Sequence, residues 1–370
     1  MTVHVWDYRA EYEAEHHEIA AAIERVFRSG RLILGPEVRA FEEEFAAYCG
    51  LRHGVGVNSG TDALFLGLKA LDIGPGDEVI TVANTAVATG AAIVATGATP
   101  RFVDIEPSTY LMDVAALEDS VTPRTKCILP VHLFGQCVRM DIVSKVAERH
   151  GLRILEDCAQ CHGATRHGIR AGGMSDIAAF SFYPTKILGG YGDGGMVVTN
   201  DEALAARVRR LRMYGMDREY CAEEHGYNSR LDEVHAAILR CKLPRLNGYI
   251  ARRQALAACY GAALADGPLV LPQIADGNVH AYYLYVARHP ERERIIAELA
   301  KRDIEVNVSY RWPIHAMRAY RDLGYRWGDL PQTEAATREI FSLPMYQSLT
   351  DAQQDAVCVA LRDVLAELGE

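Results

Sequence analysis

Between residues 78 and 156 the chain alternates short apolar runs with segments of helical periodicity, and this alternation constrains the fold more than any other feature. Short apolar runs bounded by turn residues suit buried strands, and the connections between them are brief. Strands that alternate with helices predict an open, mainly parallel α/β sheet with helices on both faces, in which ligands bind beyond the carboxyl ends of the strands. The predicted strands are 78–82, 99–104, 127–132 and 153–156, and the predicted helices between them are 85–95, 113–120 and 141–150.

The length of 370 residues and a hydrophobic content of 49% suit a large domain followed by a smaller one. Residues 1–245 are expected to form an N-terminal arm and the large domain. Residues 246–370 are expected to form a smaller α+β domain, because prolines and a glycine between 268 and 277 mark a change of pattern. Strands are predicted there at 282–287 and 305–308.

Composition argues against several classes of protein. The net charge is −10 and no block of Lys and Arg offsets it, which disfavours nucleic acid as a partner. The chain has nine cysteines, and its N-terminus is polar and does not resemble a signal peptide. Together these features suggest free thiols in a reducing cytoplasm. No apolar run approaches the roughly 20 residues of a membrane span.

A small polar turn leads from a predicted strand at 53–57 into a helical pattern, and it contains Ser59, Gly60 and Thr61. Free N–H groups and the helix dipole favour an anion at such a place. An ordinary N-cap, in which Ser59 or Thr61 satisfies the first turn, explains the pattern equally well.

Two further polar residues follow predicted strands. Asp157 ends the strand at 153–156, and Lys186 follows an apolar run at 179–183 and precedes a glycine-rich stretch. An ammonium beside apolar groups loses proton affinity and becomes an amine that can attack a carbonyl, although a solvated surface lysine is the simpler explanation. An anion site, a carboxylate and an amine together match the phosphate, the ring nitrogen and the aldehyde of pyridoxal 5′-phosphate (PLP).

At this point the sequence resembles a known family, the DegT/StrS-type sugar aminotransferases, which are PLP enzymes of fold type I. The resemblance covers most of the chain in order, so it is far more specific than any single motif. The matching segments include GVNSGTDAL (56–64), GPGDEVI (74–80), LPVHLFGQ (129–136), LEDCAQCHGA (155–164), AFSFYPTKILGGYGDGG (179–195) and NSRLDEVHAAIL (228–239).

The resemblance implies a mainly parallel seven-stranded sheet in the large domain and a role for each matching residue. Lys186 would attach the cofactor covalently and later carry the proton, Asp157 would face the pyridine nitrogen, and Gln160 would lie near the phenolic oxygen. The phosphate would be bound by Gly60, Thr61 and Ser181 next to Ser59, and by Asn228 from the partner subunit of a homodimer.

The activity that the resemblance implies is transamination of a keto group on a nucleotide-linked, probably dTDP-linked, 3- or 4-keto-6-deoxyhexose, with glutamate as amino donor. Tyr183, Tyr310 and His315 are the expected substrate contacts. Two alternatives stay open: an aminotransferase for a keto-cyclitol or another ketone without a nucleotide, and a non-catalytic PLP or sugar sensor.

Two local features complicate the resemblance. Ala86 stands where many relatives have an aromatic residue that stacks on the pyridine ring, so another group must cover that face or stacking is weaker. The C-x-x-C-H spacing of Cys158, Cys161 and His162, with His132 nearby, resembles a metal motif. No metal is expected, because this segment also contains Asp157 and Gln160.

Overall fold

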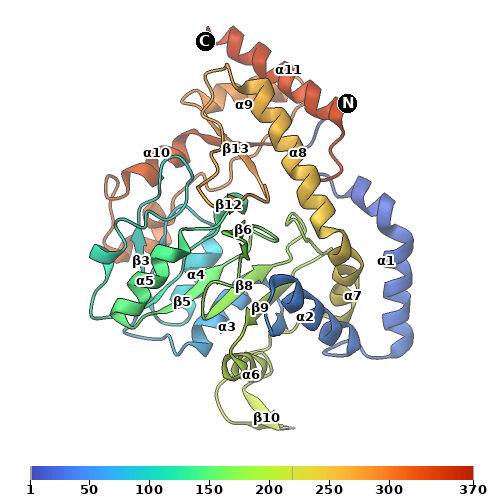
Figure 1. The fold of residues 1–370 in the computed structure, drawn as a ribbon, viewed down its shortest axis with the longest axis vertical. Coiled ribbons are helices and arrows are strands. Elements are labelled where there is room, and N and C mark those ends of the chain that lie inside the picture. Colours follow the sequence, from blue (N-terminus) through green and yellow to red (C-terminus); the bar gives the residue numbers. More distant parts are fainter. Residues whose placement is uncertain (1, 219, 370) are drawn as a thin grey trace.

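The computed structural model describes residues 2–218 and 220–369, and its centre is a seven-stranded sheet (Figure 1). The strand order is β1-β9-β8-β5-β4-β2-β3. Only β9 runs antiparallel to its neighbours in this sheet, so the sheet is mainly parallel as predicted. The strands are β1 (His53–Val57), β2 (Glu78–Val82), β3 (Thr99–Val103), β4 (Thr125–Ile128), β5 (Arg153–Asp157), β8 (Ile177–Ser181) and β9 (Gly195–Thr199).

Helices cover both faces of this sheet because alternate residues of a strand point to opposite sides. In β8, Ile177 and Ala179 join the core that contains the apolar side of α3 (Gly60–Ala70). Ala178 and Phe180 join a second core with α2 (Pro36–Cys49). All five residues of β8 are therefore buried, which explains why the sequence there is a continuous apolar run.

Among the remaining helices of the first 245 residues, α4 and α5 begin and end within two residues of the predicted positions. Gly30, Gly50 and Gly151 take up left-handed backbone directly after α1, α2 and α5, which is the usual way to end a helix. These helices are α1 (Arg9–Ser29), α4 (Val87–Ala95), α5 (Met140–His150), α6 (Glu202–Leu211) and α7 (Glu233–Lys242).

The C-terminal part has its own core between helices and a two-stranded antiparallel sheet. It lies above the large sheet in Figure 1, and α8 runs from the large sheet into it. The boundary predicted at residue 245 falls at the short turn 243–245, where α7 passes into α8. The elements are α8 (Leu246–Leu264), β13 (Tyr285–Arg288), α9 (Arg292–Ala300), α10 (Pro331–Glu339), β14 (Ile340–Leu343) and α11 (Asp351–Glu367).

Several predicted elements are wrong in detail. The helix predicted at 113–120 is reduced to a 3-10 turn, Glu118–Ser120, because the Asp113 carboxylate accepts the N–H of Ala115 and forms a turn instead. The strand predicted at 305–308 is a single bridge between Asn307 and Ser342, and β14 is the partner of β13.

The segment 214–229 contains two short antiparallel strands, β10 (Met216–Arg218) and β11 (Cys221–Ala222). They project from the body at the bottom of Figure 1. Three other short strands form a separate small sheet. They are β6 (Thr165–Arg166), β7 (Ile169–Arg170) and β12 (Asn278–Val279).

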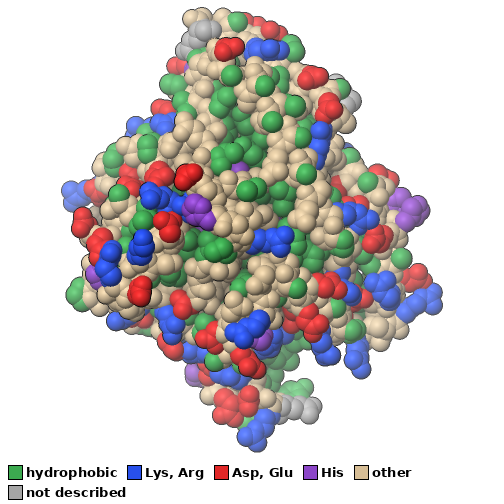
Figure 2. Space-filling view, in the orientation of Figure 1, with side chains coloured by type: hydrophobic (Ala, Val, Ile, Leu, Met, Phe, Trp, Pro, Cys, Tyr) green, Lys and Arg blue, Asp and Glu red, His purple; other side chains and the backbone are tan. Residues whose placement is uncertain are grey.

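Positive and negative side chains are interspersed on the face that Figure 2 shows. Among the described residues, no helix combines the length and the apolar character that a membrane crossing requires.

Candidate active site

Three junctions meet at one edge of the central sheet. β5 ends at Asp157 and β8 ends at Ser181, and Asp157 pairs with Ala179 in the register between these neighbouring strands. The beginning of α3 reaches the same place, because a Cβ atom built on Gly60 would lie 2.5 Å from the Cβ of Ser181. The carboxyl ends of the strands therefore bring together residues that are far apart in the sequence.

The start of α3 forms a cradle of hydrogen-bond donors. Ser59 is the N-cap residue, and its hydroxyl oxygen accepts the N–H of Asp62 at 3.1 Å, so Ser59 has the capping role that the sequence left open. The N–H groups of Gly60 and Thr61 are the first of the helix and have no acceptor within it. With the Ser181 hydroxyl beside them and the positive end of the helix dipole behind them, they suit a phosphate group.

Asp157 is a buried carboxyl group with two weak partners. One oxygen accepts the Thr89 hydroxyl at 2.9 Å, and the other accepts the N–H of Ala159 at 3.1 Å. Burial raises the pKa of Asp157, although these two hydrogen bonds and the charge of Lys186 oppose the rise. A carboxyl group in this setting is stabilised as an anion when a cationic N–H donor binds to it.

Lys186 lies in the turn that follows β8, where its N–H donates to the Tyr183 carbonyl at 2.8 Å. The side chain is half-buried, and its Nζ lies 4.4 Å from the centre of the Tyr283 ring. Its charge opposes the rise in the pKa of Asp157 that burial causes, so the two groups are near enough to interact.

Gln160 holds two aromatic residues in place. Its Oε1 accepts the N–H of Phe134 at 2.9 Å, and its Nε2 donates to the Tyr310 hydroxyl. The Phe134 and Tyr310 rings are stacked with centres 6.1 Å apart, and both residues have positive φ angles of 59° and 60°. Bulky residues with positive φ are strained and are found preferentially at functional sites.

The other predicted residues lie nearer the surface. Tyr183 is 51% exposed directly after β8. Asn228 is exposed, and the next residue, Ser229, donates its hydroxyl to Asp62 at 2.7 Å and accepts the N–H of Asn58 at 3.1 Å. Asn228 is thus attached to the segment that leads into α3.

His315 is enclosed rather than open. It is 1% exposed, lies 3.2 Å from the Glu334 carboxylate, and packs against the rings of Tyr325 and Trp327. These contacts give the His315 ring a structural role, and His315 is left out of the proposed substrate site for this reason.

His132 and Glu156, which lie beside the C-x-x-C-H segment, are hydrogen-bonded within the protein. His132, Glu156 and Cys158 place ligand-type atoms within 4.8 Å of one another. His132 donates to Glu156 at 2.7 Å through Nε2 and accepts the N–H of Val138 through Nδ1. Burial opposes ionisation of Glu156, but hydrogen bonds led by the one from His132 lower its pKa. The ring nitrogens of His132 and the carboxylate of Glu156 therefore have protein partners, whereas both ring nitrogens of the buried His162 have none among the described residues.

Three residues near the site were missed from the sequence: Thr89 contacts Asp157, Tyr283 contacts Lys186, and Thr185 hydrogen-bonds to Tyr283. Ala86 is the half-buried N-cap residue of α4, so this helix contributes the Thr89 hydroxyl to the site rather than an aromatic ring at its start. Tyr283 lies about 100 positions after Lys186 and no local pattern links them.

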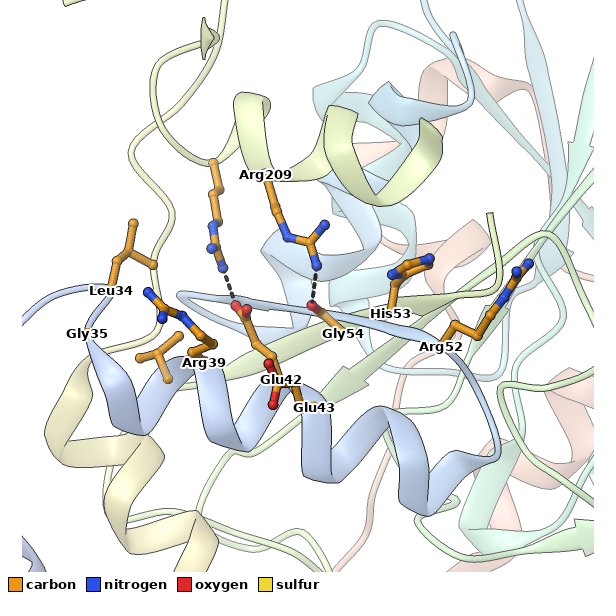
Figure 3. A pocket seen from close by; sticks show the side chains of 11 residues that line it. Leu34, Gly35, Arg39, Glu42, Glu43, Arg52, His53, Gly54 and Arg209 are labelled. Carbon is orange, nitrogen blue, oxygen red and sulfur yellow. Dashed lines mark hydrogen bonds and ion pairs between the residues drawn. The ribbon is translucent and has the colours of Figure 1, made fainter. Parts of the chain in front are cut away.

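A separate pocket of about 400 Å³ lies beside the amino end of β1, at the opposite edge of the sheet (Figure 3). Arg209 and Arg212 donate to the carbonyl groups of Gly54 and Gly56, and Arg212 also pairs with Glu42. These side chains cover the free edge of β1, which explains the charge in this pocket as protection of an edge strand.

The donor set at the carboxyl edge fits PLP group by group. The start of α3 and Ser181 offer an anion cradle, Asp157 offers a buried carboxylate, and Lys186 offers an amine. The close packing at Gly60, where a Cβ would meet Ser181, leaves the backbone itself as the surface that a phosphate can approach.

Comparisons with known proteins agree with this geometry. The family model for the DegT/DnrJ/EryC1/StrS aminotransferase family matches residues 13–362. A dTDP-3-amino-3,4,6-trideoxy-alpha-D-glucose transaminase of Micromonospora megalomicea subsp. nigra is 53% identical, with 100% of both chains covered.

Two solved structures are similar over nearly the whole chain. The S. venezuelae DesV structure, in complex with a ketimine intermediate, superposes with a TM-score of 0.96 at 46% identity and covers 98% of each chain. The PLP form of the sugar aminotransferase Spr1654 from Streptococcus pneumoniae, described as putative, has a TM-score of 0.90 at 27% identity and covers 95% of this chain and 97% of its own.

These findings confirm the predicted fold, the class of enzyme and the cofactor type. The chain belongs to the DegT/DnrJ/EryC1/StrS aminotransferase family.

Proposed function

We propose that this protein is a PLP-dependent aminotransferase that converts the 3-keto group of a dTDP-linked deoxysugar into an amine, with glutamate as the amino donor. One observation carries the proposal: Lys186, Asp157 and the start of α3 converge at one edge of the sheet. The name of the Micromonospora relative supports a dTDP-sugar and amination at its third carbon, a choice that the sequence had left open between two carbons.

Each residue of the site has its own chemical role in this proposal. PLP supplies an aldehyde that exchanges amines and a ring that accepts electrons while a C–H bond of the donor breaks. Lys186 would hold that aldehyde covalently; once released, its amine would take the proton from the donor α-carbon in the first half-reaction and give a proton to the sugar carbon in the second. Asp157 keeps the ring nitrogen protonated, and its burial strengthens that interaction.

The cradle residues anchor the phosphate. The N–H groups of Gly60 and Thr61 and the Ser181 hydroxyl bind it, next to the cap formed by Ser59. Gln160 contacts the phenolic oxygen of the cofactor, and its side chain is fixed by Phe134 and Tyr310. A fixed side chain costs less entropy when it binds a ligand.

The protein acts as a homodimer with shared sites in this proposal. Asn228 is exposed beside the segment that leads into α3, and this position supports a contact from Asn228 to the phosphate in the partner subunit. Tyr183, which is exposed beside Lys186, and Tyr310, which is held by Gln160, contact the sugar nucleotide.

Product analysis tests the proposal. Purified protein is incubated with PLP, glutamate and, in separate reactions, a dTDP-3-keto- and a dTDP-4-keto-6-deoxyhexose, and the products are identified by NMR. We expect amination at C3 with release of 2-oxoglutarate, and no product from Lys186→Ala.

Each other outcome selects a different function. Amination of a keto-cyclitol without activity on either sugar nucleotide would show that the substrate is a cyclitol and not a nucleotide-linked sugar. Protein that binds PLP but transfers no amino group from any donor would be a sensor rather than an enzyme.

A further inference from the structure

Tyr283 lies just before β13 and packs directly on Lys186. The Lys186 Nζ is 4.4 Å from the centre of the Tyr283 ring. The face of an aromatic ring attracts an ammonium group, and this attraction strengthens where water is excluded. The ring therefore holds the end of the lysine side chain in one place when the amine is not bound covalently.

The Tyr283 hydroxyl is fixed by the residue next to the lysine. The hydroxyl groups of Thr185 and Tyr283 are 3.0 Å apart, which is within hydrogen-bond distance. Two consecutive residues of the turn after β8 thus engage one tyrosine, Thr185 through its hydroxyl and Lys186 through its ring. The phenol is therefore held beside the lysine.

The electrostatic surroundings favour a shared proton. Burial alone would raise the pKa of the Tyr283 phenol, but the charge of Lys186, the hydrogen bond with Thr185 and the charge of Arg253 lower it. Arg253 on α8 donates to the Tyr283 carbonyl at 3.1 Å. The other titratable groups that act here are Tyr310, which interacts with Tyr283, and Asp157, Cys161 and His162, which interact with Lys186.

We propose that Tyr283 is a catalytic residue that exchanges one proton with Lys186, an inference that rests on the proposed function of Lys186. The pair has two forms with the same number of protons, ammonium with phenolate and amine with phenol. Conversion of the first into the second breaks one N–H bond of Lys186, leaves the electron pair on nitrogen, and forms the O–H bond of Tyr283. The amine form is the one that can attack a carbonyl or take a proton from carbon.

A tyrosinate absorbance titration of the cofactor-free full-length protein tests this pair. The chain has 18 tyrosines, so Tyr283 contributes one eighteenth of the total change. We expect a step of that size at lower pH than the remaining tyrosines, its absence in Tyr283→Phe, and its shift upward by about one pH unit or more in Lys186→Met, because the nearby positive charge is lost. The matched control is Tyr282→Phe, which removes the adjacent phenol and should leave the step in place.

The proposal is overturned if the early step persists in Tyr283→Phe or does not move in Lys186→Met. Thr185→Val gives a second test that keeps the tyrosine, and it should move the step to higher pH. In the loaded enzyme, Tyr283→Phe should change the pH profile of the reaction with glutamate, and an unchanged profile would contradict a proton exchange between the two residues. Since the titration needs neither cofactor nor substrate, it can succeed even if the proposed sugar substrate is wrong.

Discussion

At the scale of single residues, the close contact between Gly60 and Ser181 is the feature that most limits what the site can tolerate. A Cβ atom on Gly60 would lie 2.5 Å from the Ser181 Cβ and 3.1 Å from its Cα, which is closer than ordinary packing permits. Any side chain here must displace either the start of α3 or the end of β8. Both segments supply the donors that we assign to the phosphate.

Gly60→Ala is therefore expected to weaken PLP binding by at least about tenfold, a loss of roughly 1.4 kcal/mol of binding free energy. Absorbance titration of cofactor-free protein with PLP measures the effect. The control is Gly248→Ala on α8, where a Cβ would meet nothing within 4 Å. Equal PLP affinity in Gly60→Ala and the native protein would contradict the assigned phosphate site.

The residues that could be predicted from sequence are those marked by local pattern. Asp157 and Lys186 each follow an apolar run, and a strand end is a place where a polar side chain is exposed to a ligand. Tyr283 and Thr89 carry no such mark, because their contacts with the site depend on how distant elements pack. His315 shows the opposite case: it was expected to contact the substrate, but its side chain is buried against Glu334.

At the scale of elements, α2 is tied to α7 by one buried side chain. The Glu233 carboxylate accepts three N–H groups at the start of α2, from Gly35 at 2.7 Å, Glu37 at 3.0 Å and Val38 at 2.8 Å. Glu233 is 1% exposed. It caps a helix that lies about 200 residues earlier in the chain, and its negative charge also complements the helix dipole.

Glu233→Gln should lower the free energy of unfolding by about 1–3 kcal/mol, because the amide replaces one acceptor oxygen with a donor and leaves a buried N–H unsatisfied. Urea unfolding at neutral pH measures this loss. Glu43→Gln is the matched control. Glu43 is exposed on α2, the helix that Glu233 caps, and its replacement should change stability little. A loss no larger than that of the control would argue against the capping role.

Most elements could be predicted because their periodicity agrees with their burial. The strands of the central sheet are continuous apolar runs since both faces are covered. The segments at 113–120 and 305–308 were mispredicted because local turn contacts and the pairing of β13 with β14 outweigh their weak patterns. The helix α10 was missed because its sequence is mostly polar, although it is anchored by the Asp104 carboxylate.

At the scale of the whole molecule, stability should depend on pH through two buried histidines. Burial lowers the pKa of His162 and of His280 to about 3 in the folded protein, from an ordinary value of 6.5. Below pH 6.5 the unfolded chain therefore takes up protons that the folded chain does not. Their contribution to stability is full above pH 6.5 and is lost progressively as the pH falls toward 3.

When the pH falls from 7 to 5, each of these histidines should lower the free energy of unfolding by about 2 kcal/mol. Urea unfolding at the two pH values measures the sum. Burial raises the pKa of Asp157, which works in the opposite direction, so the net loss should be smaller than the sum for the two histidines. His280→Gln should reduce the loss, and stability that is equal at pH 7 and pH 5 in both proteins would contradict the account.

The central claim is that Lys186 is the amine that binds PLP. The most direct measurement is reduction of the PLP-loaded protein with borohydride, followed by proteolysis and mass spectrometry of the labelled peptide. The account predicts one phosphopyridoxyl group per chain, located on Lys186. A label on another lysine, or cofactor that is released without any label, would contradict it.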